Sequence, residues 1–331
     1  MRVLQFSRDR ELISFCNLRQ GVKKNLNLSC TEVKWNPELQ NTIASAATNG
    51  TITIWDLKSV KRKTTCVFKC KRAPYTLAWS YIDPNVLLSG STSRVQLWDT
   101  RTKKSESEYK HRRARSVHNV AFQPSVSHNR FIAGLENGSI VFWDCRYPNK
   151  PECTWKNVHH GIVTSLSWHP TLKNVLASGG RDKTIKIWQQ SSSEPEKKGD
   201  PFARIQTTSS VSRVRWRPGV DDEIASCSSI FDNDVCLWNI KRPNFPVAVF
   251  RGHTAATTGI EWVSRSNRRS EMLVSSSKDG SVLLHAIETA RVPLRHMRTG
   301  CVRFNPSGDL AFLNQPVRGV RRTSVSSFAY S

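Results

Sequence analysis

The sequence predicts an all-β propeller, a ring of short antiparallel sheets, from three observations. Apolar and polar residues alternate in short runs separated by turn formers, which is typical of consecutive antiparallel strands. A tryptophan or histidine closes each unit at intervals of 43 to 50 residues, at Trp55, Trp98, Trp143, Trp188, Trp238 and His285. A repeat period of about 40–45 residues is typical of four-stranded propeller blades.

The unit at residues 159–188 shows why each strand is expected where it is. Its three apolar runs span residues 162–168, 175–177 and 185–188, and GGRDK at residues 179–183 separates the second run from the third. Glycine supplies positive φ and aspartate tolerates it, so this turn fits a hairpin. A three-stranded unit alone would leave an apolar face and two edges in water, and it therefore requires neighbours.

Two further markers recur in every unit. An aromatic residue on an apolar strand lies about 20 residues before each closing residue, and a turn residue lies six residues before it. Three of these turns are Asn-Gly or Asp-Gly, the strongest short hairpin signal: Asn49-Gly50, Asn137-Gly138 and Asp279-Gly280. We therefore predict six repeats that end near residues 57, 100, 145, 190, 240 and 287.

Both ends of the chain carry incomplete strand patterns. Alternating residues occur within 1–28, and CVRFNP at residues 301–306 restarts the pattern that opens the other units. Because a propeller closes on itself, we predict a seventh blade made jointly by about residues 1–28 and 297–315; a six-bladed ring with loose ends is the alternative. The propeller would span residues 1–315, and the Arg- and Ser-rich tail at 316–331 is expected to be disordered.

Composition narrows the class of partner and the compartment. The 331 residues include 50 Lys and Arg against 26 Asp and Glu, a net charge of +24, which favours nucleic acid, anionic lipid or an acidic protein. The nine cysteines show no zinc-type spacing, which indicates reduced thiols in the cytosol or nucleus. No apolar run approaches membrane-spanning length, and the first residues carry charges where a signal peptide is apolar, so we predict a soluble intracellular protein.

Basic residues concentrate in two stretches, Lys58–Arg72 and Arg101–Arg115, which we place on the outermost strands of neighbouring blades. The candidate contact residues there are Lys61, Arg62, Lys63, Arg101, Arg112, Arg113 and Arg115. We expect this surface to bind an acidic protein or an anionic membrane. Nucleic acid is not expected, because the two stretches contain only Phe68 and Tyr109 as stacking rings and the chain offers no helix for a major groove.

Three units close with Trp-Asp, at Trp55-Asp56, Trp98-Asp99 and Trp143-Asp144, and nearly the whole chain resembles the WD-repeat propellers. The resemblance implies that one unit contains the buried tetrad of that family, formed by His159, Ser178, Asp182 and Trp188. In that tetrad Asp orients His, His bonds Ser, and Ser reaches the indole N–H, so the role is structural.

Other units depart from this tetrad. A second, partial set consists of His253, Ser275 and Asp279, with His285 in place of the tryptophan. No clear histidine precedes Trp35, Trp79 or Trp216. We find no phosphate-binding loop, nucleophile elbow or His-Glu-x-x-His, and the rings of His159 and His160 should point apart on a strand, so no catalytic residue, cofactor or metal is expected.

Two units continue as Trp-Asp-x-Arg, ending in Arg101 and Arg146. This pattern resembles the box by which some propellers dock onto the damaged-DNA-binding adaptor of cullin-four ubiquitin ligases, so a substrate receptor is our alternative function. An arginine at a solvated strand end explains the pattern equally. Separately, Arg321-Arg322-Thr323-Ser324 resembles the substrate pattern of basophilic kinases and makes Ser324 a candidate phosphorylation site.

A more specific resemblance extends through every unit. LNLSCTEVKWNPELQNTIASAATNGTITIWDL at residues 26–57, ENGSIVFWD at 136–144, ASGGRDK at 177–183 and VRWRP at 214–218 resemble the WD repeat-containing protein 24 family, subunits of the activating GATOR subcomplex. The resemblance implies a non-enzymatic scaffold, in the cytoplasm and at the lysosomal membrane, that promotes TOR kinase signalling in response to amino acids. Its partners would be the Seh-like and Sec-like propeller subunits of a hetero-oligomer. In that family the propeller is followed by helical and RING-like regions, so no ubiquitin-ligase role carried by that RING is assigned to this sequence.

Overall fold

The structure is a computed structural model of the chain. It describes residues 29–58, 64–111, 116–124, 130–190, 199–228, 232–263 and 272–287 with their side chains, and four further strands by their backbone. Those four strands are β1 (Arg2–Phe6), β2 (Leu12–Asn17), β26 (Gly300–Phe304) and β27 (Leu310–Asn314).

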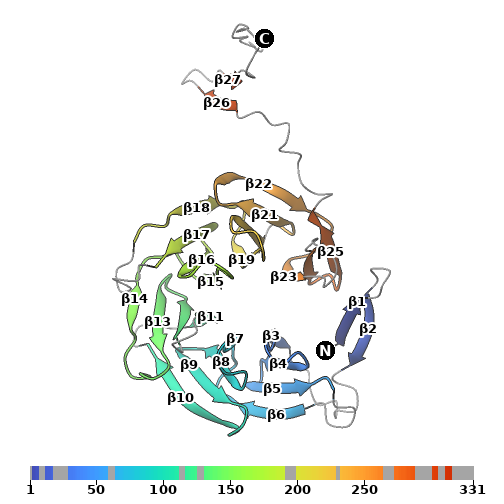
Figure 1. Ribbon diagram of the computed structural model, residues 1–331, viewed down its shortest axis with the longest axis vertical. Coiled ribbons are helices and arrows are strands. Elements are labelled where there is room, and N and C mark those ends of the chain that lie inside the picture. Colours follow the sequence, from blue (N-terminus) through green and yellow to red (C-terminus); the bar gives the residue numbers. More distant parts are fainter. Residues whose placement is uncertain are drawn as a thin grey trace.

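Six antiparallel sheets, each made of consecutive strands, surround a central opening as the blades of a propeller (Figure 1). Blades one to five have four strands each. They are β3 (Cys30–Trp35), β4 (Thr42–Ala47), β5 (Thr51–Asp56) and β6 (Thr64–Lys69); β7 (Thr76–Trp79), β8 (Val86–Ser91), β9 (Arg94–Asp99) and β10 (Lys104–Lys110); β11 (Val117–Phe122), β12 (Arg130–Leu135), β13 (Ile140–Asp144) and β14 (Cys153–Trp155); β15 (Val163–Trp168), β16 (Val175–Gly180), β17 (Thr184–Gln189) and β18 (Ala203–Gln206); and β19 (Val211–Trp216), β20 (Glu223–Ser228), β21 (Val235–Asn239) and β22 (Arg242–Phe250). Blade six has β23 (Thr257–Val263), β24 (Met272–Ser277) and β25 (Val282–Ala286). The predicted all-β WD-repeat propeller is confirmed.

The first strand of each blade lies nearest the central opening (Figure 1). Neighbouring inner strands contact one another around the ring, for example β7 with β11, β11 with β15, and β15 with β19. Because these inner strands lie side by side around the opening, the side chains at their two ends gather at its two mouths. This arrangement places residues from all six blades around one axis.

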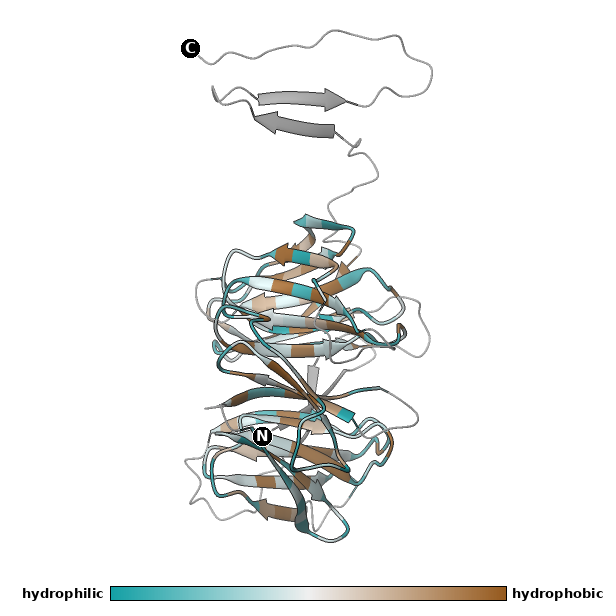
Figure 2. Cartoon of the chain, turned by 90° about the vertical axis from the view of Figure 1, so that its left-hand side faces the viewer, coloured by the Kyte–Doolittle hydropathy of each residue, from teal (hydrophilic) through white to brown (hydrophobic). Residues whose placement is uncertain are grey.

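The hydrophobic core lies between blades, since each blade buries one sheet face against the next. Five apolar clusters fill the five interfaces between consecutive blades. At the third interface Trp155 packs on Phe142 at a ring-centroid distance of 4.6 Å and on Trp188 of blade four at 5.7 Å. The middle strand β16 (VLASGG) is buried along its whole length and consists of apolar or small residues, whereas the outer strand β6 (TTCVFK) alternates between buried and more exposed residues. Apolar and polar segments follow one another along the strands of the propeller (Figure 2).

The glycines of the three Asn-Gly and Asp-Gly turns have positive φ, as the hairpin prediction requires: 83° at Gly50, 79° at Gly138 and 83° at Gly280. The surroundings of these turns differ. A Cβ on Gly138 would lie 2.0 Å from the carbonyl oxygen of His159, whereas a Cβ on Gly280 would meet nothing within 4 Å. A substitution at Gly280 therefore meets backbone strain alone, whereas a substitution at Gly138 meets backbone strain and a steric clash.

We expect Gly280→Ala to lower the free energy of unfolding by about 1 kcal/mol, the strain of a left-handed alanine. Gly138→Ala adds a collision with backbone and should lower it by at least about 2 kcal/mol. Urea unfolding of both variants measures the difference. Equal losses would contradict the close approach of the third-blade turn to His159.

The two ends of the chain form separate hairpins. β1 pairs only with β2 and β26 only with β27 among the described strands, and blade six has no described fourth strand. The predicted seventh blade, shared by both ends, is therefore not observed as one sheet. A seventh blade would require the two terminal hairpins to pair with each other. Residues 288–299, which lead from blade six to β26, lie outside the described residues, and so does the tail at 316–331.

Candidate functional site

Blade four contains a buried chain of four hydrogen-bonded side chains. His159 Nδ1 lies 2.9 Å from Asp182 Oδ1, and His159 Nε2 lies 2.8 Å from Ser178 Oγ. The indole N–H of Trp188 donates to the same Ser178 oxygen at 2.9 Å. His159 precedes β15, Ser178 lies on β16, Asp182 on the following turn and Trp188 on β17, so the network links every inner element of the blade.

The carboxylate of Asp182 fixes the direction of each proton in this chain. A carboxylate can only accept, so a neutral His159 carries its proton on Nδ1 and donates it to Asp182. His159 Nε2 then accepts from the hydroxyl of Ser178, whose oxygen also accepts from the indole N–H of Trp188. Burial lowers the pKa of His159, so the neutral tautomer that this chain requires is the one present at neutral pH.

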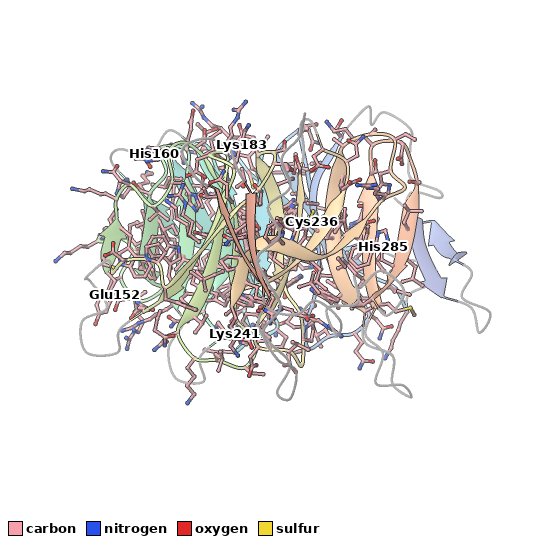
Figure 3. All side chains as sticks on the ribbon, turned by 90° about the horizontal axis from the view of Figure 1, so that it is seen from above. Glu152, His160, Lys183, Cys236, Lys241 and His285 are labelled. Atoms are coloured by element: carbon pink, nitrogen blue, oxygen red, sulfur yellow. The ribbon has the colours of Figure 1, made fainter. Side chains whose placement is uncertain are left out.

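Asp182 is ionised in the folded protein. Burial raises the pKa of its carboxyl group, but hydrogen bonds from His159 and Thr184 and from the backbone N–H of His160 outweigh burial and hold that pKa well below its usual range. Figure 3 shows the neighbouring His160 and Lys183 at one rim of the ring, with Glu152 and Lys241 at the opposite rim.

Blade six holds a variant in which histidine replaces tryptophan. Ser275 Oγ lies 2.7 Å from His253 Nε2 and 2.6 Å from His285 Nε2. His253 Nδ1 lies 2.9 Å from Ser281 Oγ, which itself donates to Asp279, while the direct distance from Nδ1 to the Asp279 carboxylate is 3.4 Å. His285 thus completes the chain with an imidazole N–H, and a fifth residue, Ser281, joins it.

We expect the blade-six network to make stability depend on pH. Burial, with a smaller effect of His253, lowers the pKa of His285 to about 4, against about 6.5 when unfolded. Between about pH 6.5 and pH 4 the unfolded chain therefore binds more protons than the folded chain. The free energy of unfolding is highest above about pH 6.5, and it falls by up to about 1 kcal/mol per pH unit as the pH drops toward 4. The lowered pKa of His159 acts in the same direction, while carboxylates such as Asp182 act only at lower pH.

His285→Gln keeps an N–H for Ser275 and cannot titrate, so it should flatten this slope. Urea unfolding of wild type and variant at several pH values between about 7 and 4.5 measures it. Identical slopes for the two proteins would show that His285 does not titrate with folding.

Three other blades keep the serine and tryptophan without the histidine. The indole N–H donates to a serine hydroxyl in each: Trp55 to Ser45 at 2.8 Å, Trp98 to Ser89 at 2.8 Å, and Trp238 to Ser226 at 2.9 Å. These pairs were not predicted, because the units lack the histidine that marks a complete tetrad. The sequence signal for them is a serine nine to twelve residues before the closing tryptophan.

The arginines of the two Trp-Asp-x-Arg motifs fold back onto their own aspartates. Arg101 Nη2 lies 2.6 Å from Asp99 and 2.8 Å from Asp83, and Arg146 Nη2 lies 2.6 Å from Asp144. The arginine hydrogen bonds lower the pKa of both motif aspartates, Asp99 and Asp144, against the opposing effect of burial. Both arginines therefore form ion pairs within the chain at a strand end. These ion pairs account for the two arginines without docking to an adaptor.

The two basic stretches lie on the fourth strands of adjacent blades, β6 and β10 (Figure 1). Lys69, Lys104 and Lys110 are exposed, but Glu108 lies 3.2 Å from Lys110 and reduces the local excess of positive charge. Phe68 and Tyr109 are both buried, so neither ring can stack on a base. Lys61, Arg62, Lys63, Arg112, Arg113, Arg115 and Ser324 lie outside the described residues.

Within the described ranges no three His, Cys, Asp or Glu side chains gather as a metal site would require. No helix in the same ranges is long and apolar enough to cross a membrane. The seven described cysteines, all outside disulfides, are Cys30, Cys66, Cys70, Cys145, Cys153, Cys227 and Cys236.

Comparison with known proteins supports this geometry. A family model for the WD domain, G-beta repeat, matches residues 150–189 and 244–285. The chain is 34% identical over 307 residues to the GATOR2 complex protein WDR24 of Homo sapiens and 36% identical over 325 residues to Wdr24 of Drosophila melanogaster. These matches cover 92% and 95% of this chain but 38% and 40% of the relatives, so the chain spans about two fifths of their length.

A solved structure shows the same fold. A chain in the "Crystal Structure of Mitotic Checkpoint Complex" superimposes with a TM-score of 0.67 at 19% identity, covering 88% of this chain and 81% of that chain. This likeness concerns the fold alone.

Proposed function

Because this chain is a WD-repeat propeller and a homologue of the GATOR2 complex protein WDR24, we propose that it is a non-catalytic scaffold subunit of a GATOR-type complex. As such it promotes TOR kinase signalling in response to amino acids, in the cytoplasm and at the lysosomal membrane. Its partners are the Seh-like and Sec-like propeller subunits of a hetero-oligomer.

One observation carries this proposal: the identity to WDR24 proteins extends over about nine tenths of the chain rather than over isolated repeats. Generic WD-repeat similarity is concentrated in the turns and closing tryptophans that every blade shares. The polar networks support a scaffold role, since their donors and acceptors are directed at one another.

Affinity purification of the tagged chain from cells tests the proposal. We expect Seh-like and Sec-like propellers to co-purify, and no cullin-four adaptor. The double variant Arg101→Ala, Arg146→Ala should leave this set unchanged, because both arginines bond their own strands. If the wild-type chain recovers the adaptor in stoichiometric amounts and the double variant does not, the chain is a ligase substrate receptor and the scaffold proposal is wrong.

The outer surface formed by β6 and β10, with the adjoining basic stretches, is our proposed contact with an acidic subunit or anionic membrane. Each basic residue near an anionic surface contributes about 1 kcal/mol, so binding should weaken as salt rises. Sedimentation with anionic liposomes, pull-down with the acidic subunits and titration with mixed-sequence nucleic acid compare the partners. Tight, salt-resistant, sequence-dependent binding of nucleic acid would contradict this assignment.

A further inference from the structure

Exposed apolar side chains gather at one end of the ring. That end, here called the Glu152 end, consists of the connections from first to second strand and from third to fourth strand in each blade, and Figure 3 labels Glu152 and Lys241 there. Around the central opening it exposes Leu39, Tyr81, Ile82 and Leu172, and farther out Tyr147, Phe202 and Phe245. Trp35 is exposed there too, but a seventh blade would cover it, so it is left out of this set.

The opposite end, which carries His160 and Lys183, differs. Tyr75, in the connection from β6 to β7, is the one large apolar side chain of the described residues that is exposed there. Apolar surface collected on one side of a protein marks an interaction site. The unequal distribution therefore points to the Glu152 end as an interface.

The charges at the Glu152 end compensate one another. Its cations form ion pairs with carboxylates of the same chain at distances of 2.5 to 3.2 Å: Arg101–Asp99, Arg130–Glu152, Arg146–Asp144, Arg215–Glu261, Arg217–Glu223 and Lys241–Asp222. Outside these pairs both signs occur, since Glu38 and Asp221 are exposed as well as Lys150 and Lys173. The complementary partner surface is therefore apolar and close to neutral, although the whole chain carries +24.

The centre of the Glu152 end is hollowed. A cavity of about 240 Å³ lies beside Tyr81 and Pro37 at this mouth of the central opening, and Val120, Phe122 and Leu166 supply apolar wall. A cavity of about 150 Å³ holds benzene, so a leucine or aromatic side chain of a partner has room here. Binding energy in protein interfaces concentrates in such anchors when they fill a desolvated pocket.

We propose that the Glu152 end binds a protein subunit of the complex through an apolar, nearly neutral surface, with one apolar side chain of that subunit in the cavity. This inference rests on the proposed scaffold function and adds a second contact to the basic surface of β6 and β10. An anionic membrane suits this end less well, because Glu38 and Asp221 lie among its apolar side chains. Salt screens charges, so this contact should persist at salt concentrations that weaken the basic one.

Affinity purification of the tagged full chain at low and high salt tests the surface. Tyr81→Ser combined with Ile82→Ser removes two exposed side chains beside the cavity and should reduce recovery of the other subunits roughly tenfold or more at both salt concentrations. Leu172→Ser, in blade four, should reduce recovery in the same direction. Tyr75→Ser is the matched control, because Tyr75 is 40% exposed at the opposite end and Tyr81 is 54% exposed. It should leave recovery unchanged, and all variants should melt at the wild-type temperature, since the removed side chains are exposed.

The outcomes separate this inference from the scaffold function. If the wild type recovers the subunits and the Tyr81, Ile82 and Leu172 variants recover them equally well, the surface is wrongly assigned while the scaffold function stands. If the wild type recovers no subunit, both are wrong. Two further measurements name the other occupants: sedimentation with anionic liposomes that the double variant loses would assign this end to a membrane, and dimers of the purified chain that the double variant loses would assign it to a second copy. Either result would overturn the proposal.

Discussion

Replacing Asp182 with alanine is expected to lower the free energy of unfolding by about 2–4 kcal/mol. The carboxylate accepts from His159 at 2.9 Å, from the hydroxyl of Thr184 at 2.8 Å and from the backbone of His160 at 3.1 Å. His159 is buried, so its Nδ1–H loses the acceptor that orients the whole chain through Ser178 to Trp188. Thr184 Oγ1, 3.2 Å from Nδ1, can replace it only in part.

Asp232→Ala is the matched control, since Asp232 occupies the same turn position in blade five without a histidine. It accepts from Thr208 at 2.7 Å on the surface, and its loss should lower stability by less than about 1 kcal/mol. Urea unfolding of both variants gives the comparison. An unchanged melting midpoint for Asp182→Ala would show that the network does not stabilise the blade.

Trp35→Ala is expected to lower the free energy of unfolding by about 3–5 kcal/mol, although Trp35 is 51% exposed in the six-bladed ring. The tryptophans that end the inner strands of blades two, four and five are buried against the preceding blade, at 4–8% exposure. Only blade one has no described predecessor. There Trp35 donates to Gln40 of its own loop, and its neighbour Val33 is 43% exposed.

The chain itself offers the missing neighbour. β26 (GCVRF) is followed by Asn-Pro, as β3 is in VKWNP, and its pairing with β27 matches that of β3 with β4, Phe304 opposite Leu310 and Trp35 opposite Ile43. A seventh blade would take its inner strands from β26 and β27 and its outer strands from β1 and β2. It would cover the face of blade one that exposes Trp35 and Val33 and make that face a buried interface between blades.

Trp79→Ala, in the second blade, gives the reference for a buried tryptophan, and the two variants should lose similar stability in urea unfolding. A loss below about 1 kcal/mol for Trp35→Ala would indicate an uncovered face and a six-bladed ring.

Local sequence determined the blades because their signals are local. The φ values of Gly50, Gly138 and Gly280 follow from two-residue turns, and each inner strand ends at the expected tryptophan or phenylalanine, or one residue beyond it. The four-residue network of blade four was also predictable, since His159, Ser178, Asp182 and Trp188 lie within one repeat whose strand register fixes their spacing.

The sequence by itself therefore determined the repeat, the turns and the outer position of the two basic stretches. Tertiary structure alone decided that His285 donates where other blades use tryptophan, that Arg101 turns back to Asp83, and that Glu32 meets Arg213 across the ring. The last two residues are 181 positions apart, in blades one and five, and no periodicity within a repeat relates them. The ring arrangement brings the inner strands of all six blades around one axis, and only that geometry sets Glu32 beside Arg213.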